Sequence, residues 1–334
     1  MIMSKLDVII PVYNSRPYLE KMFNSFNLQT RRDFRLIIVN DGSTDNSLDY
    51  IESVRKKYSF ETTVLSQVNS GVSAARNNGL RSARNDIVTF LDSDDYPEPN
   101  YVEKILEEFE KDPNLDAFSF SINIVGEKNG EKKKRIGTNQ KNGTYNNVDL
   151  LHSFLESRFR LFIFSIAVKT QSLLGNEIFY PEGYRNLEDV NYCFQLLSVS
   201  KKVVIKNVPL YNYLVRESSS TTRYNVLTDW KKSLEVMGLL NDVFKRTCPA
   251  FLDYYEKYGI PKLVWTMTWQ SVKVSRKYAT FLDFTNLIRS KHHLKRMSSF
   301  PSKMISFSSR TFLFSPRLFY YLVLILGRNK NRSN

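Results

Sequence analysis

Three aspartates, Asp92, Asp94 and Asp95, lie within four positions of one another, directly after the apolar run IVTFL at residues 87–91. Carboxylates at this spacing repel each other unless a positive group lies between them. Mg²⁺ and Mn²⁺ prefer oxygen ligands, and with only one or two protein carboxylates they keep positions open for phosphate oxygens. The stretch therefore indicates either a metal site for a diphosphate or a turn of surface acids before a helix.

Polar segments also follow the other apolar runs of the N-terminal half. In NDGSTD, Asp41 can accept a hydrogen bond from a base or ribose, and Gly42 permits a tight turn. In NSGVSAARNNG, small residues allow close backbone approach, and Arg76 can neutralise a phosphate or hold Asp92 in place. Taken singly, each segment also fits a simpler explanation, a turn before a helix or a solvated arginine.

Apolar runs alternate with amphipathic segments and predict the elements that carry these side chains. We expect strands at 6–13, 34–41, 62–67 and 86–92, and helices at 17–29, 43–58, 73–83 and 100–112. Ser43 or Thr44 is the expected cap of the second helix, and Asn100 with Glu103 predicts a capping box for the fourth. The alternation predicts α/β units and a doubly wound, mostly parallel sheet. Ligands bind beyond the carboxyl ends of such strands, so the polar segments should meet at one rim.

The pattern changes after the fourth predicted helix. Residues 115–126 alternate like a half-exposed strand, and the charged residues 127–135 predict a hairpin tip. From about Asp229 onward the chain is expected to be helical. We therefore expect an α/β domain at 1–225, with halves at 1–110 and 111–225, and a helical C-terminal region at 226–334.

Positive charge is concentrated at the C-terminal end. The 334 residues have a net charge of +14, and residues 284–334 contribute +10 of it, because they hold ten Lys or Arg and no acidic residue. Such a tail suits anionic lipid or nucleic acid, or it is simply solvated. Residues 318–326, LFYYLVLIL, are too short for a spanning helix and predict either an interfacial anchor or a core helix.

Cysteine and histidine usage restricts the chemistry and the compartment. Two cysteines and three histidines argue against a structural zinc site and a histidine-based catalyst, and they fit a reducing compartment. The first apolar run is short and contains Asp7, which does not fit a secretory signal. We expect a cytoplasmic protein, peripheral on the inner face of the cell membrane if the tail binds lipid.

Four segments together, VIIPVYN, IIVNDGSTDNS, NSGVSAARNNG and FLDSDD, resemble the inverting glycosyltransferases of family 2, which have the GT-A fold. The resemblance covers roughly residues 5–220. It implies a nucleotide-sugar donor, typically a UDP-sugar, a divalent metal, Mn²⁺ or Mg²⁺, and single displacement at the anomeric carbon. By this resemblance, residues 1–110 form the donor half and residues 111–225 the acceptor half of the catalytic domain.

The resemblance also assigns donor residues, position by position. It implies that Asp41 binds the base and that Asp92 lies near ribose and metal, while Asp94 ligates the metal and Asp95 supports the site. It also implies that Pro11, Val12 and Tyr13 line the base site. Arg76 and Ser93 are further candidates for donor binding. One departure is Asn40, where an acid is more usual, and it puts the hydrogen-bond support of Asp41 in doubt.

An inverting transfer needs a base to deprotonate the acceptor hydroxyl. Glu188 and Asp189 open a predicted helix, where the helix dipole favours carboxylates, and an ordinary acidic helix start is the alternative. The family carries its base in such a pair, usually on the aspartate, so the resemblance implies Asp189, with Glu188 as the alternative. It also implies that the loop with Tyr213, Arg216 and Ser218 touches diphosphate or acceptor.

Two rival functions remain to be weighed. A nucleotidyltransferase would show a glycine-rich phosphate loop after the first strand, whereas residues 11–21, PVYNSRPYLEK, contain no glycine. A non-enzymatic nucleic-acid or lipid-binding protein would leave the polar strand ends unexplained.

The favoured expectation is metal-dependent sugar transfer to a lipid-linked glycan acceptor, without a nucleic-acid partner. The expected setting is the synthesis of a bacterial capsule, exopolysaccharide or other cell-surface glycan. The sugar, the linkage and the oligomeric state are not indicated.

Overall fold

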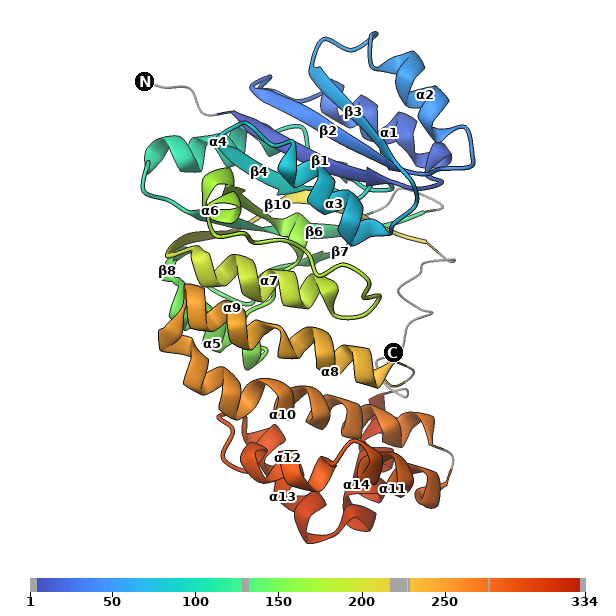
Figure 1. Ribbon diagram of the computed structural model, residues 1–334, viewed down its shortest axis with the longest axis vertical. Helices are drawn as coiled ribbons and strands as arrows, with labels where there is room; N and C mark the ends of the chain where they lie inside the picture. The colour runs from blue at the N-terminus through green and yellow to red at the C-terminus, as the bar shows by residue number, and fades with distance from the viewer. Residues whose placement is uncertain (1–4, 128–131, 217–226, 228, 276, 331–334) are drawn as a thin grey trace. The chain divides into compact units, whose positions relative to one another are not determined.

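The structure is a computed structural model that describes residues 5–127, 132–216, 227, 229–275 and 277–330. The chain divides into two compact units, Met1–Thr222 and Arg223–Asn334. Figure 1 shows a sheet with helices packed along it in the first unit and helices in the second.

A ten-stranded sheet, counted over the described residues, forms the centre of the first unit. Its main order is β3-β2-β1-β4-β9-β6-β10-β5, with β7 beside β6 and β8 beside β10. The strands are β1 (Leu6–Val12), β2 (Phe34–Asp41), β3 (Glu61–Gln67), β4 (Ile87–Phe90), β5 (Tyr96–Pro97), β6 (Ala117–Gly126), β7 (Lys132–Ile136), β8 (Gly143–Asn146), β9 (Ile166–Lys169) and β10 (Lys202–Val215).

The first four strands of the chain form the expected parallel, doubly wound half. β3, β2, β1 and β4 are neighbours in that order and all pair in parallel. The helices that connect them or follow them are α1 (Arg16–Asn27), α2 (Ser47–Val54), α3 (Val72–Arg81) and α4 (Tyr101–Lys111). The prediction of a mostly parallel α/β sheet is therefore confirmed.

Helices cover both faces of this half, which explains why its strands are continuous apolar runs. Alternate residues of β1, from Leu6 to Val12, pack in one core with Phe23 of α1. On the other face α3 packs against β1 and β2. A methyl group at Gly79 of α3 would lie 2.4 Å from the Ile9 side chain, so only glycine allows this close approach.

Both predicted helix caps are wrong because tertiary contacts use the side chains differently. α2 begins at Ser47 rather than after Ser43 or Thr44, because Asn14 Oδ1 accepts from the Thr44 and Asp45 amides and holds them outside the helix. At α4, Asn100 makes no side-chain cap bond, and the Glu103 carboxylate accepts from Thr30 instead.

The strand β6 differs from the half-exposed strand expected at 115–126. Nine of its ten positions are buried, because β6 lies inside the sheet between β9 and β10. Its polar residues are satisfied internally: Ser119 donates to the Ser165 carbonyl, and Asn123 donates to Asn212. β6 and β7 pair antiparallel, and the intervening tip at 128–131 lies outside the described residues.

The remaining helices of the first unit are α5 (Asn147–Leu155), a 3-10 turn (Ile163–Ser165), α6 (Thr170–Leu174) and α7 (Glu188–Val199). α7 begins directly after Leu187, whose left-handed φ of 63° turns the chain into the helix. This turn places Glu188 and Asp189 in the first helical turn.

The second unit is helical over its described residues, as expected. It consists of α8 (Trp230–Gly238), α9 (Leu240–Thr247), α10 (Pro249–Val274), α11 (Tyr278–Leu287), α12 (Ser290–Met297), α13 (Lys303–Phe314) and α14 (Pro316–Lys330). Aromatic rings join the last helices: Phe319 of α14 lies 5.4 Å from Phe312 of α13 and 6.2 Å from Phe281 of α11, centroid to centroid. Among the helices described, none is both long and apolar enough to cross a membrane.

Candidate active site

The predicted site residues follow strands that end at the same edge of the sheet. β1, β2 and β4 are parallel, and β6 points the same way as β4 because both pair antiparallel with β9. β10 is parallel to β6, so Arg216 follows a carboxyl end at the edge where Asp41 and Asp92 also lie. The sheet topology thus brings segments that are more than a hundred residues apart in the sequence to one rim.

Asp95 anchors the acidic turn to β10. Its Oδ2 accepts from the Tyr211 hydroxyl at 2.5 Å, and its Oδ1 accepts from the Leu214 amide at 2.7 Å. The Asp92 amide in turn donates to the Tyr211 oxygen at 3.2 Å. Burial raises the pKa of Asp95 well above its ordinary value, and the charges of Asp94 and Asp92 raise it further. Both Asp95 oxygens therefore have protein partners.

Arg76 of α3 bridges two carboxylates that are distant in the sequence. Its Nη2 donates to Asp92 Oδ1 and its Nη1 donates to Asp189 Oδ1, each at 2.8 Å, and its side chain is only 5% exposed. Burial lowers the pKa of Arg76, but the two carboxylates outweigh burial and keep it above its ordinary value. The arginine beside Asp92 that the sequence indicated thus also contacts the predicted base.

Asp94 lies beside a second arginine. Arg216 Nη2 is 2.7 Å from Asp94 Oδ2, and the Arg216 guanidinium lies over the Tyr18 ring, 5.2 Å from its centroid. Burial raises the pKa of Asp94, the Asp92 charge raises it further, and Arg216 opposes the rise. A positive charge at this carboxylate is therefore electrostatically favourable.

Glu188 and Asp189 lie together at the start of α7. Burial raises the pKa of both groups. The Asp189 charge raises the pKa of Glu188 further. At Asp189 itself, Arg76 lowers the pKa, whereas the Asp92 charge raises it. The Asp189 side chain is still 49% exposed, so an acceptor hydroxyl can approach it.

The predicted base-binding residues differ in accessibility. Pro11 and Val12 are buried inside β1, whereas Tyr13, just past the strand end, is 51% exposed and offers a ring face. Asp41 is buried, and its carboxylate accepts from the Gln67 side chain and from the amides of Ser70 and Gly71 at 2.8–2.9 Å. Asn40, the unusual residue beside it, accepts from the Ser43 amide.

Other predicted residues hold the rim together or lie elsewhere. Ser93 is buried, and its hydroxyl is 2.7 Å from that of Ser15. Tyr213 is part of β10 rather than of a loop, and it stacks on Phe164 at 5.6 Å. Ser218 lies outside the described residues.

Two supporting residues have no signal in the sequence. Tyr211 fixes the acidic turn, as described above. Asn77, next to Arg76, bonds both the amide and the carbonyl of Tyr180 and the Glu182 carboxylate, and so holds the segment before α7. Neither residue type indicates a site by itself, and only the fold brings the two side chains there.

The acidic turn offers a donor set that fits a hard divalent cation. Asp92 and Asp94 each contact an arginine through one carboxylate oxygen, Asp92 Oδ1 and Asp94 Oδ2. The described residues contain no cluster of three or more acidic, histidine or cysteine ligands. Two carboxylates suit a magnesium-type ion whose remaining positions go to phosphate and water.

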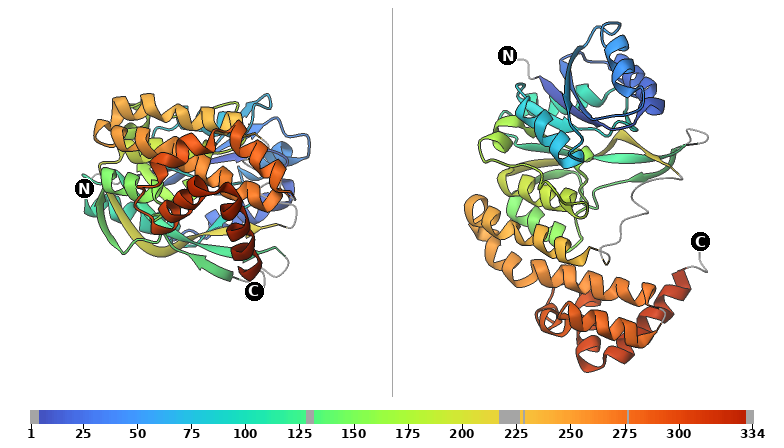
Figure 2. Two further views of the ribbon diagram at one scale, coloured as in Figure 1. Left: turned by 90° about the horizontal axis from the view of Figure 1, so that it is seen from below. Right: turned by 45° about the vertical axis from the view of Figure 1, so that its right-hand side comes forward.

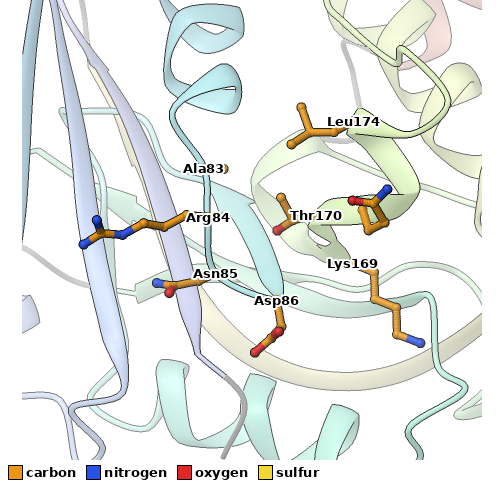
Figure 3. A pocket seen from close by; sticks show the side chains of 8 residues that line it. Ala83, Arg84, Asn85, Asp86, Lys169, Thr170 and Leu174 are labelled. Atoms are coloured by element: carbon orange, nitrogen blue, oxygen red, sulfur yellow. The ribbon is translucent and has the colours of Figure 1, made fainter.

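A surface hollow of about 370 Å³ lies away from this rim. It is lined by residues 83–86, by residues 169–171 and by Leu174, at the amino end of β4 and the end of its antiparallel neighbour β9 (Figure 3). Its charged residues have protein partners: Asp86 accepts from the Lys5 amide, and Lys169 donates to the Pro113 carbonyl. The chemistry indicated by the sequence lies at the opposite ends of the strands.

Comparison with known proteins points to the same family that the sequence motifs resemble. Residues 7–170 match the sequence profile of the family described as glycosyl transferase family 2. The chain is 31% identical over 229 residues to glycosyltransferase GlyA of Streptococcus pneumoniae, which covers 64% of this chain and 31% of that protein. It is 30% identical over 218 residues to the poly(ribitol-phosphate) beta-glucosyltransferase of Bacillus spizizenii, covering 64% of this chain and 32% of that protein.

The fold is also similar to a solved structure. The crystal structure of Staphylococcus aureus TarS residues 1–349 with UDP-GlcNAc superposes with a TM-score of 0.66 and 20% identity, covering 94% of this chain and 91% of the other. This similarity confirms the expected fold class. The chain spans about a third of the length of the two curated relatives.

Proposed function

The chain belongs to glycosyl transferase family 2 through its domain at residues 7–170, and from this premise we propose that it transfers a sugar from a nucleotide sugar to a glycan acceptor. The observation that carries the proposal is the Arg76 bridge. One guanidinium holds an acid of the donor-side turn, Asp92, and the carboxylate placed to act as base, Asp189, each at 2.8 Å. Donor and acceptor chemistry would thus meet at one point of the rim.

The donor is a UDP-sugar in this proposal. Tyr13 offers an exposed ring for stacking on the base, and Asp41 shapes the adjoining turn at residues 67–71 through its three hydrogen bonds. The TarS structure, solved with UDP-GlcNAc, supports this donor class by analogy. Arg216, 2.7 Å from Asp94, would meet the diphosphate in this proposal.

The proposal includes a divalent cation, Mn²⁺ or Mg²⁺, held by Asp94 and Asp92. The support is the donor set: two neighbouring carboxylates that each contact an arginine through only one oxygen, and burial that raises the pKa of Asp94. When bound, such an ion neutralises charge on the leaving diphosphate. Asp95 is engaged with β10 and is left out of this ligand set.

Asp189 acts as the general base. It accepts the proton of the acceptor hydroxyl while the acceptor oxygen forms its bond to the anomeric carbon. The bond from that carbon to the diphosphate oxygen breaks, and the nucleoside diphosphate leaves with the electron pair. The raised pKa of Asp189 brings it closer to working pH, and Arg76 fixes the orientation of its carboxylate. Glu188 is the alternative base.

The acceptor is a glycan of the bacterial cell surface, carried on lipid. The named activity of the Bacillus spizizenii relative, glucosylation of poly(ribitol-phosphate), supports a surface-glycan acceptor. In this proposal the enzyme works on the cytoplasmic side, at the inner face of the membrane. Capsule and exopolysaccharide synthesis are the settings that this acceptor class implies.

Calorimetry with UDP tests the donor half of the proposal. Wild-type protein should bind UDP in the presence of Mn²⁺ and much more weakly without it. Asp189→Asn should keep this binding, because the base contacts the acceptor, and it should lose transfer. If UDP binding were independent of metal, or absent, the proposed donor site would be wrong.

A further inference from the structure

α13 and α14 carry an exposed apolar surface that the proposed active site does not use. Within each helix its positions recur at intervals of three, four or seven residues, which is the spacing of one helical face. Phe307 is 68% exposed and Phe314 is 86% exposed. We call this set the outer face: Met304, Phe307, Phe314, Leu318, Tyr321, Leu322, Ile325 and Leu326.

The opposite side of the same two helices is packed in the helical unit. Ile305, Phe312, Phe319 and Val323 are at most 3% exposed. Figure 2 (left) shows the two dark red helices following each other with a sharp bend between them. One side of each helix therefore packs in the core of the helical unit. The outer face is a second apolar side, and it is exposed. Of residues 318–326, Phe319, Tyr320 and Val323 are buried, as expected for a core helix, whereas most of the others are exposed. The interfacial anchor stays a prediction.

Eight exposed apolar side chains on two consecutive helices indicate an interaction surface. The charge of the residues beside the outer face indicates the kind of partner. Lys303 and Arg317 are exposed beside the outer face, and residues 284–334 hold ten basic and no acidic residues. In a second copy of the chain, Lys303 and Arg317 would meet the same two positive residues, which opposes self-association through this face. An anionic lipid surface offers apolar chains and negative headgroups together.

We propose that the outer face docks on an anionic membrane, with its aromatic and aliphatic side chains entering the headgroup boundary and the basic residues meeting phosphate groups. The helices lie on the bilayer rather than across it, in keeping with their length and composition. The evidence for the docking surface comes from α13 and α14 alone. Its use in reaching a lipid-linked acceptor depends on the proposed transferase function.

Vesicle co-sedimentation of the full chain tests the docking surface without any activity measurement. The probes are vesicles of phosphatidylcholine alone and of phosphatidylcholine with phosphatidylglycerol. Wild-type protein should bind the anionic vesicles, bind the neutral ones far less, and dissociate as salt is raised. Phe307→Ser with Phe314→Ser should weaken binding roughly tenfold or more. Lys303→Gln with Arg317→Gln should weaken it about fivefold for each charge removed.

A matched variant controls for loss of exposed apolar area in general. Leu28→Ser with Leu239→Ser replaces side chains that are 66% and 43% exposed and lie outside the outer face, so vesicle binding should be unchanged. Equal thermal unfolding of all variants shows that the fold is intact. Wild-type binding that is equal on neutral and anionic vesicles, or undiminished in the Phe variant, would overturn the proposal. So would light scattering that shows a dimer dissociated by the Phe variant.

Donor cleavage by the same proteins separates this proposal from the proposed function. Release of nucleoside diphosphate from a soluble donor should be the same in the Phe variant and the wild type, because the outer face lies outside the rim residues. Vesicle binding without any donor cleavage would leave the docking surface standing and refute the transferase function.

Discussion

Replacing Arg76 by methionine tests whether this residue couples the two halves of the site. The change keeps an apolar stem in a side chain that is 5% exposed, and it removes both 2.8 Å bonds, to Asp92 and to Asp189. Arg76→Lys keeps a positive charge, but an ammonium group cannot reproduce the planar fork that holds two carboxylates at once.

The expected magnitude follows from the exposure of the two partners. A hydrogen bond to a charged group contributes about 1.5–3 kcal/mol. Asp92 and Asp189 are 28% and 49% exposed, so water screens both bonds and the lower value applies to each. The loss is then about 3 kcal/mol for Arg76→Met, which corresponds to roughly 10²-fold in kcat if both bonds orient the reacting groups. Arg76→Lys should lose about half of this free energy.

The pH dependence of kcat distinguishes coupling from simple loss of packing. Asp189 must be ionised to act as base, so the rate falls as pH drops through its pKa. Arg76 opposes the rise of that pKa, and its removal must move the acidic limb of the profile to higher pH. The assay is nucleoside diphosphate release at saturating donor and acceptor, measured from acidic to neutral pH.

Arg81→Met is the matched control. Arg81 is an exposed arginine of the same helix, and its guanidinium lies over the Phe179 ring at 4.8 Å. Its replacement should leave both kcat and the acidic limb unchanged. A loss of kcat in Arg76→Met with the limb at its wild-type position would refute the electrostatic coupling and reduce Arg76 to a packing role.

Four further substitutions separate the roles of the acidic residues. Asp189→Asn should abolish transfer and spare UDP binding, whereas Glu188→Gln should retain most activity; the reverse pattern in steady-state kinetics would assign the base to Glu188. Asp94→Ala should abolish the Mn²⁺ dependence of UDP binding in calorimetry, and a binding curve that still responds to Mn²⁺ would remove Asp94 as ligand. Tyr211→Phe removes a buried 2.5 Å bond to Asp95 and should lower the free energy of unfolding in urea by about 1.5–3 kcal/mol at neutral pH. That deficit should shrink as pH falls and Asp95 takes up a proton, since its pKa in the folded state is raised; a deficit that does not change with pH would contradict this role.

Local sequence predicted most of the first half of the fold. The strands from β1 to β4 lie in a sheet covered on both faces, so their apolar runs are long and easily recognised. Their polar ends were also predictable, because parallel strands bring their carboxyl ends to one edge. The helix caps were not predictable, because Thr30 and Asn14, from other elements, take over the hydrogen bonds that a local rule assigns.

Long-range contacts account for what the sequence did not reveal. Arg76 and Asp189 are 113 positions apart, and Asp95 and Tyr211 are 116 apart, so neither pair forms a local pattern. The sequence predicts Arg76 beside Asp92, which is near it in the chain. The second bond of Arg76, to Asp189, depends on where α7 begins. The alternating serines and asparagine of β6 predict a half-exposed strand, whereas in the sheet Ser119 donates to the Ser165 carbonyl and Asn123 donates to Asn212.

The most direct test of the central claim is a donor screen with the full chain. Nucleotide sugars are incubated with protein, a glycan acceptor preparation and Mn²⁺, and the released nucleoside diphosphate is measured for wild type and for Asp94→Ala. We predict release of UDP from at least one UDP-sugar, lost on chelation of the metal and in Asp94→Ala. Absence of release from every nucleotide sugar, or release that neither chelation nor Asp94→Ala affects, would contradict a metal-dependent glycosyltransferase built on this rim.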